Sequence, residues 1–226
     1  MATLTRTMTS TSSSTSSSTS AIIIDLYRHS RRADDDDDPV IRASAEARPF
    51  DVSLSPAGHE KAQFKHISGT GYIFCSPFWR CIQTAKEFQD RKGGIIMIDN
   101  GLCEVWHPKV TKVPLAQVAL HGDEVVSTLT TLFKRNTTPL PTEEETRGTG
   151  GTADARYRAT ITRIAKWCAA KGIDRVTIVS HGDSVSSLAA MCGVEIYSIE
   201  PCGRISASYD GEWKYLDSDE VGVLNN

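Results

Sequence analysis

A short, mostly apolar run that contains three β-branched isoleucines, 21–27 (AIIIDLY), constrains the fold of this chain most strongly. It is apolar at nearly every position and does not alternate with polar residues, which is typical of a strand buried on both faces of a parallel sheet. Such a strand needs helices on both faces of its sheet. Arg28 and His29 follow directly, at the carboxyl end of the predicted strand.

Further apolar runs alternate with helical patterns along the chain. Ser55-Pro56 and Ser76-Pro77 each combine an N-cap residue with proline at the first helical position, and both pairs predict a helix start. Alternation of strands and helices predicts an α/β fold, a three-layer sandwich with a mostly parallel central sheet flanked by helices. We expect strands over 72–75, 95–98 and 175–180, helices over 56–66, 76–88, 123–134, 153–171 and 182–192, an exposed loop over 137–152, and a hairpin of 204–209 and 212–216 that turns at Asp210-Gly211.

Length and composition suit one globular domain. The 226 residues are 39% hydrophobic and 23% charged, enough for one sizeable core. Residues 1–20 are nearly all Ser and Thr and bury too little apolar surface to offset the entropy of ordering. We therefore expect a disordered tail over 1–20 and a folded domain over 21–226.

Charge and hydropathy exclude several function classes. The net charge of -3 argues against binding to nucleic acid or to an anionic membrane, both of which need a clustered positive field. No apolar stretch approaches the roughly 20 residues that cross a bilayer, and no secretory signal is visible. The six cysteines form no CxxC pair, which favours a reducing compartment, so we expect a cytoplasmic protein. The serine-rich leader with Arg6 leaves organelle import as the alternative.

Polar clusters follow the predicted strands. They are Arg28-His29, residues 76–80 (SPFWR), residues 102–104 (LCE) and His181-Gly182. Because the carboxyl ends of parallel strands meet at one edge of a sheet, where helix N-termini offer amides to anions, we expect these side chains to converge.

These residue types suit phosphoryl transfer without a metal. Arginine binds phosphoryl oxygens bidentately and stays charged at any working pH. A neutral imidazole is a nucleophile, and a carboxylic acid protonates the departing oxygen. No HxE, HExxH or clustered carboxylate spacing is present, so neither a metal nor another cofactor is expected.

Five motifs in order resemble those of the histidine phosphatase superfamily, the phosphoglycerate-mutase-like proteins. One such motif arises often by chance, whereas five in order at plausible separations are a specific signal. The resemblance spans roughly residues 21 to 216 and implies a catalytic domain of this fold. The motifs are Arg28-His29-Ser30, 51–58 (DVSLSPAG), 75–85 (CSPFWRCIQTA), 102–104 (LCE) and 179–182 (VSHG).

The resemblance implies a role for each site residue. His29 is the implied nucleophile, with Glu104 as general acid and then general base. Arg28, Arg80 and His181 are the implied phosphate pocket. Asp51 and Asp183 remain alternatives to Glu104 as the acid.

One branch of the superfamily resembles this chain most. Arg32 matches a second arginine of the phosphatases similar to the suppressors of T-cell-receptor signalling and to ecdysteroid-phosphate phosphatase, and it is the additional substrate-binding residue expected here. Where the mutases usually have a Glu-Ser-x-x-Asn type segment, this chain has residues 31–33 (RRA) and an aspartate run, 34–38. That difference favours a phosphatase over a mutase. The aspartate run is interpreted as a solvated loop tip, with a charged gate as the alternative.

Ser30 stands where the family usually has glycine, and its Cβ is expected to strain the turn that orients the His29 ring and to lower activity. We expect Glu104 to begin the reaction protonated and His29 to begin it neutral, which predicts an acidic to neutral pH optimum.

The function expected is therefore a metal-independent phosphomonoester hydrolase with a phosphohistidine intermediate on His29. Its partner is a small-molecule or protein phosphomonoester. The alternatives are a phosphoglycerate or phosphosugar mutase and a phosphoryl-binding pseudoenzyme or adaptor. The oligomeric state stays open, a homodimer included.

Overall fold

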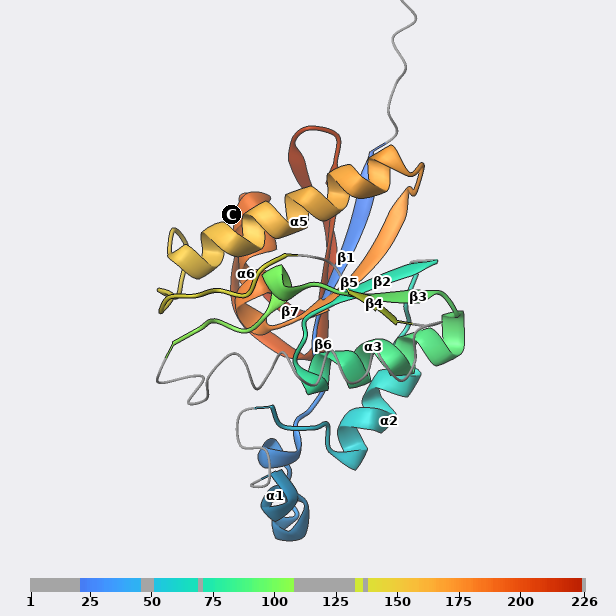
Figure 1. The fold of residues 1–226 in the computed structure, drawn as a ribbon, viewed down its shortest axis with the longest axis vertical. Coiled ribbons are helices and arrows are strands. Elements are labelled where there is room, and N and C mark those ends of the chain that lie inside the picture. The colour runs from blue at the N-terminus through green and yellow to red at the C-terminus, as the bar shows by residue number, and fades with distance from the viewer. Residues whose placement is uncertain (1–20, 46–50, 69–70, 108–132, 136–137, 225–226) are drawn as a thin grey trace, which may run out of the picture.

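A seven-stranded sheet forms the middle layer of the protein (Figure 1). The computed structural model describes residues 21–45, 51–68, 71–107, 133–135 and 138–224, so the predicted tail over 1–20 lies outside the described residues. The strands are β1 (Ile22–Arg28), β2 (Tyr72–Cys75), β3 (Ile95–Ile98), β4 (Phe133–Arg135), β5 (Arg175–Ser180), β6 (Glu195–Tyr209) and β7 (Trp213–Leu224). They are ordered β4-β3-β2-β5-β1-β6-β7.

The first five strands in this order, β4, β3, β2, β5 and β1, are parallel to one another. At the other end β6 pairs antiparallel with β1, and β7 pairs antiparallel with β6. The predicted α/β class with a mostly parallel sheet is confirmed. The predicted strands over 72–75, 95–98 and 175–180 match β2, β3 and β5 at both ends.

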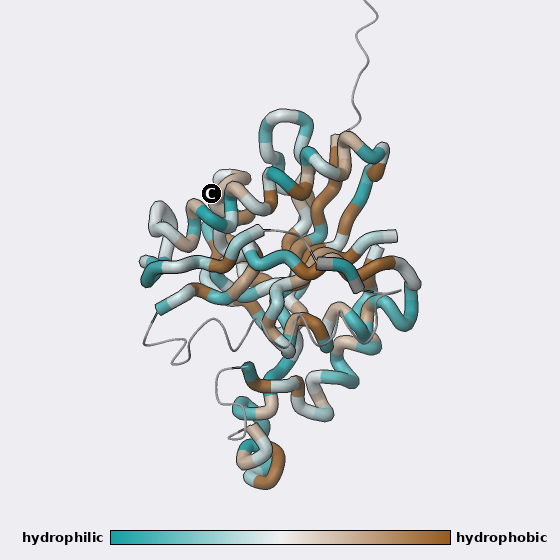
Figure 2. Tube along the Cα trace, viewed as in Figure 1, coloured by the Kyte–Doolittle hydropathy of each residue, from teal (hydrophilic) through white to brown (hydrophobic). Residues whose placement is uncertain are grey.

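Helices cover both faces of the sheet (Figure 1). One apolar core lies between the sheet and α5 with α6, and a second lies between the opposite face and α2 with α3. Hydrophobic residues accordingly gather along the central strands (Figure 2). The helices are α1 (Pro39–Ala45), α2 (Pro56–Phe64), α3 (Trp79–Lys92), α5 (Thr152–Ala170) and α6 (Gly182–Met191), with short 3-10 turns η1 (Ala33–Asp35) and η2 (Asn100–Leu102).

Strand β1 is buried on both faces, as its apolar run predicts. Ile24 and Leu26 contribute to the core under α5 and α6, whereas Tyr27 belongs to the core under α2 and α3. Asp25 is also fully buried, and its carboxylate accepts hydrogen bonds from Arg175 Nε at 2.6 Å and Arg204 Nη1 at 3.2 Å. The charge is tolerated because it is paired and hydrogen-bonded.

Helix α3 begins at Trp79 and not at Ser76-Pro77 as predicted. The chain bends at Pro77 and Phe78, and the Ser76 hydroxyl accepts a hydrogen bond from the Phe78 amide at 3.3 Å without capping a helix. In contrast, Ser55 caps α2 as predicted, because its Oγ accepts from the Gly58 amide at 3.1 Å.

The helix predicted over 123–134 is wrong at its end, because residues 133 and 134 belong to β4, which pairs in parallel with β3. Residues 123–132 lie outside the described residues. Helix α1, which opens at Pro39, was not predicted within the polar segment before Leu54. Its Ile41 packs on a small apolar cluster of Ala33, Ala45 and Val52.

The terminal hairpin turns at Asp210-Gly211 as predicted but is longer, because β6 has 15 residues and β7 has 12. The register of β6 is irregular between Ile199 and Arg204, where Cys202 has a φ of 59°. Pro201 and Gly203 in this bulge obscure the strand pattern in the sequence. Among the described residues, every helix is too short or too polar to span a membrane.

Candidate active site

The carboxyl ends of β1 and β5 bring the two predicted histidines together. Arg28 pairs with Ser180 in the sheet, and the His29 amide donates to the Ser180 carbonyl at 2.8 Å. His181 follows Ser180 and is the N-cap residue of α6. The rings of His29 and His181 lie with their centroids 5.5 Å apart.

Arg80 and Glu104 reach the same place from other elements. Arg80 is the second residue of α3, and Glu104 follows η2 beyond the end of β3. Arg80 Nη2 donates to Glu104 Oε2 at 3.2 Å, and His181 Nδ1 lies 3.1 Å from the same oxygen. The structure thus brings together His29, Arg80, Glu104 and His181, as the sequence predicts.

The His29 ring is held with one nitrogen free for chemistry. Its Nδ1 lies 2.8 Å from the Ser30 carbonyl, which only accepts hydrogen bonds, so Nδ1 carries the proton and Nε2 has the lone pair. Burial, together with the charges of Arg80 and His181, holds the pKa of His29 well below its ordinary value. The imidazole is neutral at pH 7, as a nucleophile must be.

Ser30 does not strain the turn after His29, so that expectation is wrong. Among the described residues, the non-glycine residues with positive φ are Cys202 and Glu220. The Ser30 Oγ donates to the Gly58 carbonyl at 2.7 Å, and the Ser30 amide donates to Thr84 Oγ1 at 3.1 Å. The hydroxyl therefore ties the turn after His29 to α2 instead of disturbing it.

The chain packs tightly where α2 meets this turn. A Cβ at Gly58 would lie 2.1 Å from the Arg31 carbonyl oxygen, so only glycine fits there without a shift of the backbone. The Ser55 amide donates to the same carbonyl at 3.0 Å. The motif 51–58 thus acts as the support of the His29 turn.

Glu104 is a carboxylate in this arrangement. Burial raises its pKa, but the charges of His181 and Arg80 and the hydrogen bond to His181 outweigh burial and hold the pKa well below its ordinary value. This differs from the expectation that Glu104 begins protonated, because that expectation did not include direct ion pairing with Arg80. The other oxygen, Oε1, accepts from the Val105 amide at 3.0 Å.

His181 is fully buried and held at both ring nitrogens. Its Nε2 lies 2.8 Å from Ser76 Oγ, and its Nδ1 faces Glu104 and Arg80. Burial lowers the pKa of His181 although Glu104 opposes the shift. Ser76 therefore positions a site histidine, a role that its predicted N-cap position concealed.

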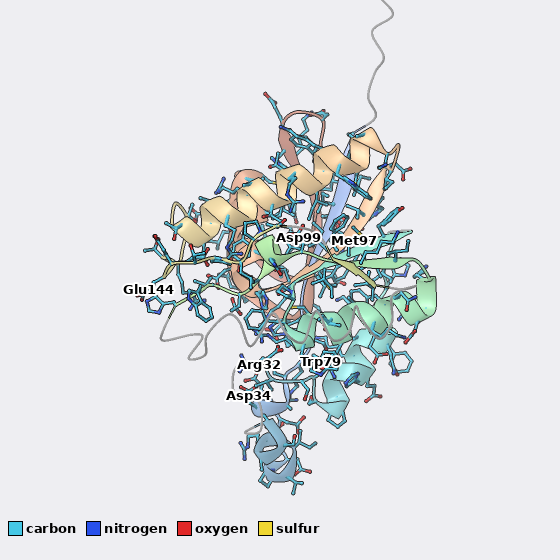
Figure 3. The ribbon with its side chains drawn as sticks, in the orientation of Figure 1. Arg32, Asp34, Trp79, Met97, Asp99 and Glu144 are labelled. Atoms are coloured by element: carbon cyan, nitrogen blue, oxygen red, sulfur yellow. The ribbon has the colours of Figure 1, made fainter. Side chains whose placement is uncertain are left out.

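Arg28 and Arg32 complete the cationic side of the pocket. Arg28 Nη1 donates to the Ile199 carbonyl of β6 at 2.6 Å. Arg32 pairs with Asp34 through two hydrogen bonds, and the two residues lie side by side in Figure 3. Arg31 pairs similarly with Asp37 at 3.0 Å. Part of the aspartate run 34–38 therefore orients arginines and is not only a solvated loop tip.

Arg28, His29, Arg32 and Glu104 line a pocket of about 360 Å³, and Arg80 and His181 lie behind them against Glu104. Arg147 and Asp183 also line it and form a bidentate pair, with Arg147 Nη2 2.7 Å from Asp183 Oδ2 and Nε 3.2 Å from Oδ1. Sequence reasoning missed Arg147 because it lies in a loop predicted to be exposed. The available signal was that Arg147 is the one basic residue between positions 137 and 152.

Arg156 of α5 fixes the segment that carries Glu104. It pairs with Glu145 at 2.6 Å and donates to the carbonyls of Gly101 at 2.8 Å and Cys103 at 3.0 Å. This buried pair was also missed, because its partners are distant in sequence. Glu145 accordingly is buried although the loop around it was predicted to be exposed.

The alternative acids differ in position. Asp183 lines the pocket with His29, whereas Asp51 Oδ1 accepts from the Trp79 amide at 2.5 Å at the start of α3. Trp79 packs against the core under α2 and α3. His107 lies 3.5 Å from Glu144, outside the residues that line the pocket.

The site suits an anion better than a cation. Ligand atoms of His29, Glu104 and His181 all lie within 4.8 Å of one another, a spacing that fits a metal ion. However, Arg80 donates to the same Glu104 carboxylate, and Arg28, Arg32 and Arg147 line the pocket. A divalent cation would be repelled by these arginines, whereas phosphoryl oxygens would be bound by them.

The fold and the site define an α/β protein with a histidine–arginine anion pocket at the carboxyl ends of its parallel strands. The sequence profile of the histidine phosphatase superfamily (branch 1) matches residues 26–200. The chain belongs to this superfamily. No curated protein sequence matches this chain.

Solved structures share its fold. A phosphoglycerate mutase from Bacillus anthracis has 17% identity and a TM-score of 0.59, over 88% of this chain and 93% of that one. The ecdysone phosphate phosphatase of Bombyx mori, solved with tungstate, has 14% identity and a TM-score of 0.56, over 91% and 95%. A mycobacterial glucosyl-3-phosphoglycerate phosphatase has 18% identity and a TM-score of 0.52, over 91% and 99%. At these identities the likeness establishes the fold alone.

Replacing Ser30 by glycine is expected to destabilise the protein. The substitution removes the hydrogen bond to Gly58 and frees the backbone of the turn, so the free energy of unfolding should fall by about 1–2 kcal/mol. Urea denaturation measures this loss, and Ser68→Gly, at an exposed position, is the control. An unchanged or higher unfolding free energy in Ser30→Gly would show that the hydroxyl does not hold the turn.

Acidification is expected to destabilise the protein through the two site histidines. The pKa values of both histidines are lowered in the folded protein, so below about pH 6.5 the unfolded chain binds protons that the folded chain does not. The free energy of unfolding therefore falls as the pH falls. Glu104, whose pKa is also lowered, loses its contribution only below about pH 4.3. From pH 7.5 to 5.5 the unfolding free energy should drop by about 1–3 kcal/mol. The drop should be smaller in His29→Ala, and an equal drop there would contradict the assignment to His29.

Proposed function

We propose that the protein is a phosphomonoester hydrolase that works through a phosphohistidine on His29. The observation that supports this most is the hydrogen bond from His29 Nδ1 to the Ser30 carbonyl, 2.8 Å long. It leaves Nε2 with a lone pair, and His29 lines a pocket together with arginines. A nucleophile and binding groups for phosphoryl oxygens are therefore adjacent.

In the first step Nε2 of His29 attacks phosphorus while Arg28, Arg80 and His181 bind the phosphoryl oxygens. The bond between phosphorus and the ester oxygen breaks, and that oxygen takes a proton from Glu104. In the second step the Glu104 carboxylate accepts a proton from water, and the water oxygen attacks phosphorus. The bond to Nε2 then breaks, which releases inorganic phosphate and restores His29.

Glu104 acquires its proton when the substrate binds. A phosphoryl dianion placed between Arg80 and His181 draws these groups away from Glu104 and adds a negative charge beside it. Both changes raise the pKa of the Glu104 carboxyl from the low value that Arg80 and His181 now impose. The carboxylate of the unoccupied site thereby becomes the acid of the complex, and an acidic to neutral optimum follows.

Hydrolysis is favoured over phosphoryl transfer to a second substrate. Asp34 and the rest of the aspartate run stand where the mutases usually have a Glu-Ser-x-x-Asn type segment, and Asp34 pairs with Arg32.

The partner proposed is a small-molecule or protein phosphomonoester. All six cysteines are free thiols, which supports the proposal of a cytoplasmic location.

His29→Ala is expected to abolish hydrolysis of p-nitrophenyl phosphate, because the intermediate has no other site of attachment. Rapid acid-free quenching of the wild type with a ³²P-labelled ester should trap a phosphoenzyme that is stable to alkali and labile to acid. Full activity of the variant, or label on another residue, would exclude the proposed mechanism. Labelled enzyme that passes phosphate to phosphoglycerate faster than to water would indicate a mutase instead.

Glu104→Gln is expected to lower kcat about 10²–10⁴-fold for an alkyl phosphate, whose leaving group needs a proton. The loss should be smaller for p-nitrophenyl phosphate, whose leaving group is a stable anion. Asp183→Asn, at the alternative acid in the pocket, is expected to lose less than about 10-fold for the alkyl ester. An equal loss for both esters in Glu104→Gln, or the larger loss in Asp183→Asn, would assign the acid elsewhere.

A further inference from the structure

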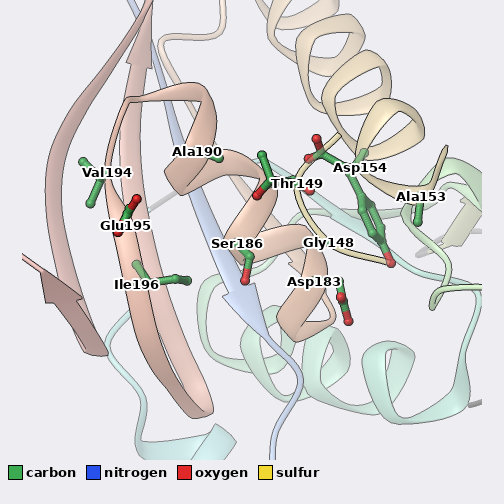
Figure 4. A pocket seen from close by; sticks show the side chains of 12 residues that line it. Gly148, Thr149, Ala153, Asp154, Asp183, Ser186, Ala190, Val194, Glu195 and Ile196 are labelled. Atoms are coloured by element: carbon green, nitrogen blue, oxygen red, sulfur yellow. The ribbon is translucent and has the colours of Figure 1, made fainter. Parts of the chain in front are cut away.

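A second cavity of about 370 Å³ adjoins the catalytic pocket, and we call it the annex (Figure 4). It lies between the loop at Gly148, the first turns of α5, one side of α6 along most of its length, and the start of β6. Asp183, Ser186 and Ile196 line both the annex and the catalytic pocket. The two cavities therefore share a wall, and a ligand whose phosphoryl group lies at His29 is next to the annex.

The annex presents carboxylates and hydroxyls. No lysine, arginine or histidine of the described chain is among its lining residues, although the catalytic pocket beside it is rich in arginine. The arginines paired with its aspartates, Arg147 and Arg158, do not line it. Its polar lining residues include Thr149, Asp154, Asp183, Ser186, Ser187 and Glu195.

Asp154 places a buried carboxylate on the wall of the annex. The residue is 5% exposed, and its Oδ2 accepts from the Gly150 amide and from Arg158 Nε, both at 2.8 Å. The Ser187 hydroxyl also stabilises the charge, and Oδ1 is shut off from solvent. This wall therefore carries a negative charge beside a space that no cation lines, so an anionic ligand gains little binding energy there.

We propose that the annex binds the alcohol part of the substrate and that this part is an uncharged sugar or similar polyol. Sugar hydroxyls donate to carboxylates and exchange hydrogen bonds with serine and threonine hydroxyls. A second phosphate or a carboxylate would meet Asp154, Asp183 and Glu195 without a cation in the lining to bind it. This inference rests on the proposed phosphatase function and adds the class of substrate.

A matched pair of esters tests the annex without any mutation. Glucose 6-phosphate and cyclohexylmethyl phosphate both place a six-membered ring on a primary alkyl phosphate, but only the first has hydroxyls. We expect kcat/KM to be at least about 10-fold higher for glucose 6-phosphate, the effect of one hydrogen bond to a charged group. Equal values, or a preference for cyclohexylmethyl phosphate or for fructose 1,6-bisphosphate, would overturn the proposal.

Filling the annex tests its location. Ala190→Leu adds three carbons to its wall, and it should lower kcat/KM for glucose 6-phosphate about 10-fold while changing that for p-nitrophenyl phosphate less than about 3-fold. Ala155→Leu, the same substitution at an exposed position of α5, is the control and should change neither. Equal loss for both esters in Ala190→Leu, or no loss, would place the sugar elsewhere.

Binding separates this proposal from the proposed function. Calorimetry of His29→Ala with the two matched esters measures a ratio of Kd values that does not depend on turnover. A preference for glucose 6-phosphate without hydrolysis by the wild type would support the annex and refute the phosphatase. Hydrolysis without a preference in either kcat/KM or Kd would support the phosphatase and refute the annex.

Discussion

The parallel pairing of β1 with β5 is the interaction on which the rest of the structure depends. It aligns Arg28 with Ser180, so the residues that follow, His29 and His181, leave the sheet side by side. Both strands are buried on both faces, which requires α5 and α6 on one side and α2 and α3 on the other. The apolar run that forms the core therefore also sets the distance between the two site histidines.

Charge pairing gives the site its second constraint. Glu104 is held between Arg80 and His181, while Arg32 and Arg147 are held by Asp34 and Asp183. Each arginine is thereby oriented before an anion arrives, so less side-chain entropy is lost on binding. An anion that bound between Arg80 and His181 would exchange one negative partner for another and would not leave Arg80 buried without one.

The sequence predicted those parts of the fold that depend on local pattern. Strands such as 72–75 are short apolar runs with clear ends, and Ser55 caps α2 by contacts within three residues. Ser76 looked the same locally, but its hydroxyl contacts His181, 105 residues away, and α3 starts later. Arg147 likewise enters the site only through Asp183, so its role depends on tertiary contacts that no local pattern contains.

Asp183 lines both the catalytic pocket and the annex. Its pairing bears on the choice between hydrolysis and phosphoryl transfer to a second phosphorylated substrate. A mutase must hold an acceptor that carries a further anionic group, and this requires a cation beyond the reacting phosphoryl group. Arg147 is suitably placed, but both oxygens of Asp183 engage its guanidinium. If Arg147 turned away to bind a second anion, Asp183 would be left without its arginine between the pocket and the annex. The arrangement therefore offers a second anion little binding energy, whereas a neutral acceptor such as water meets no such barrier.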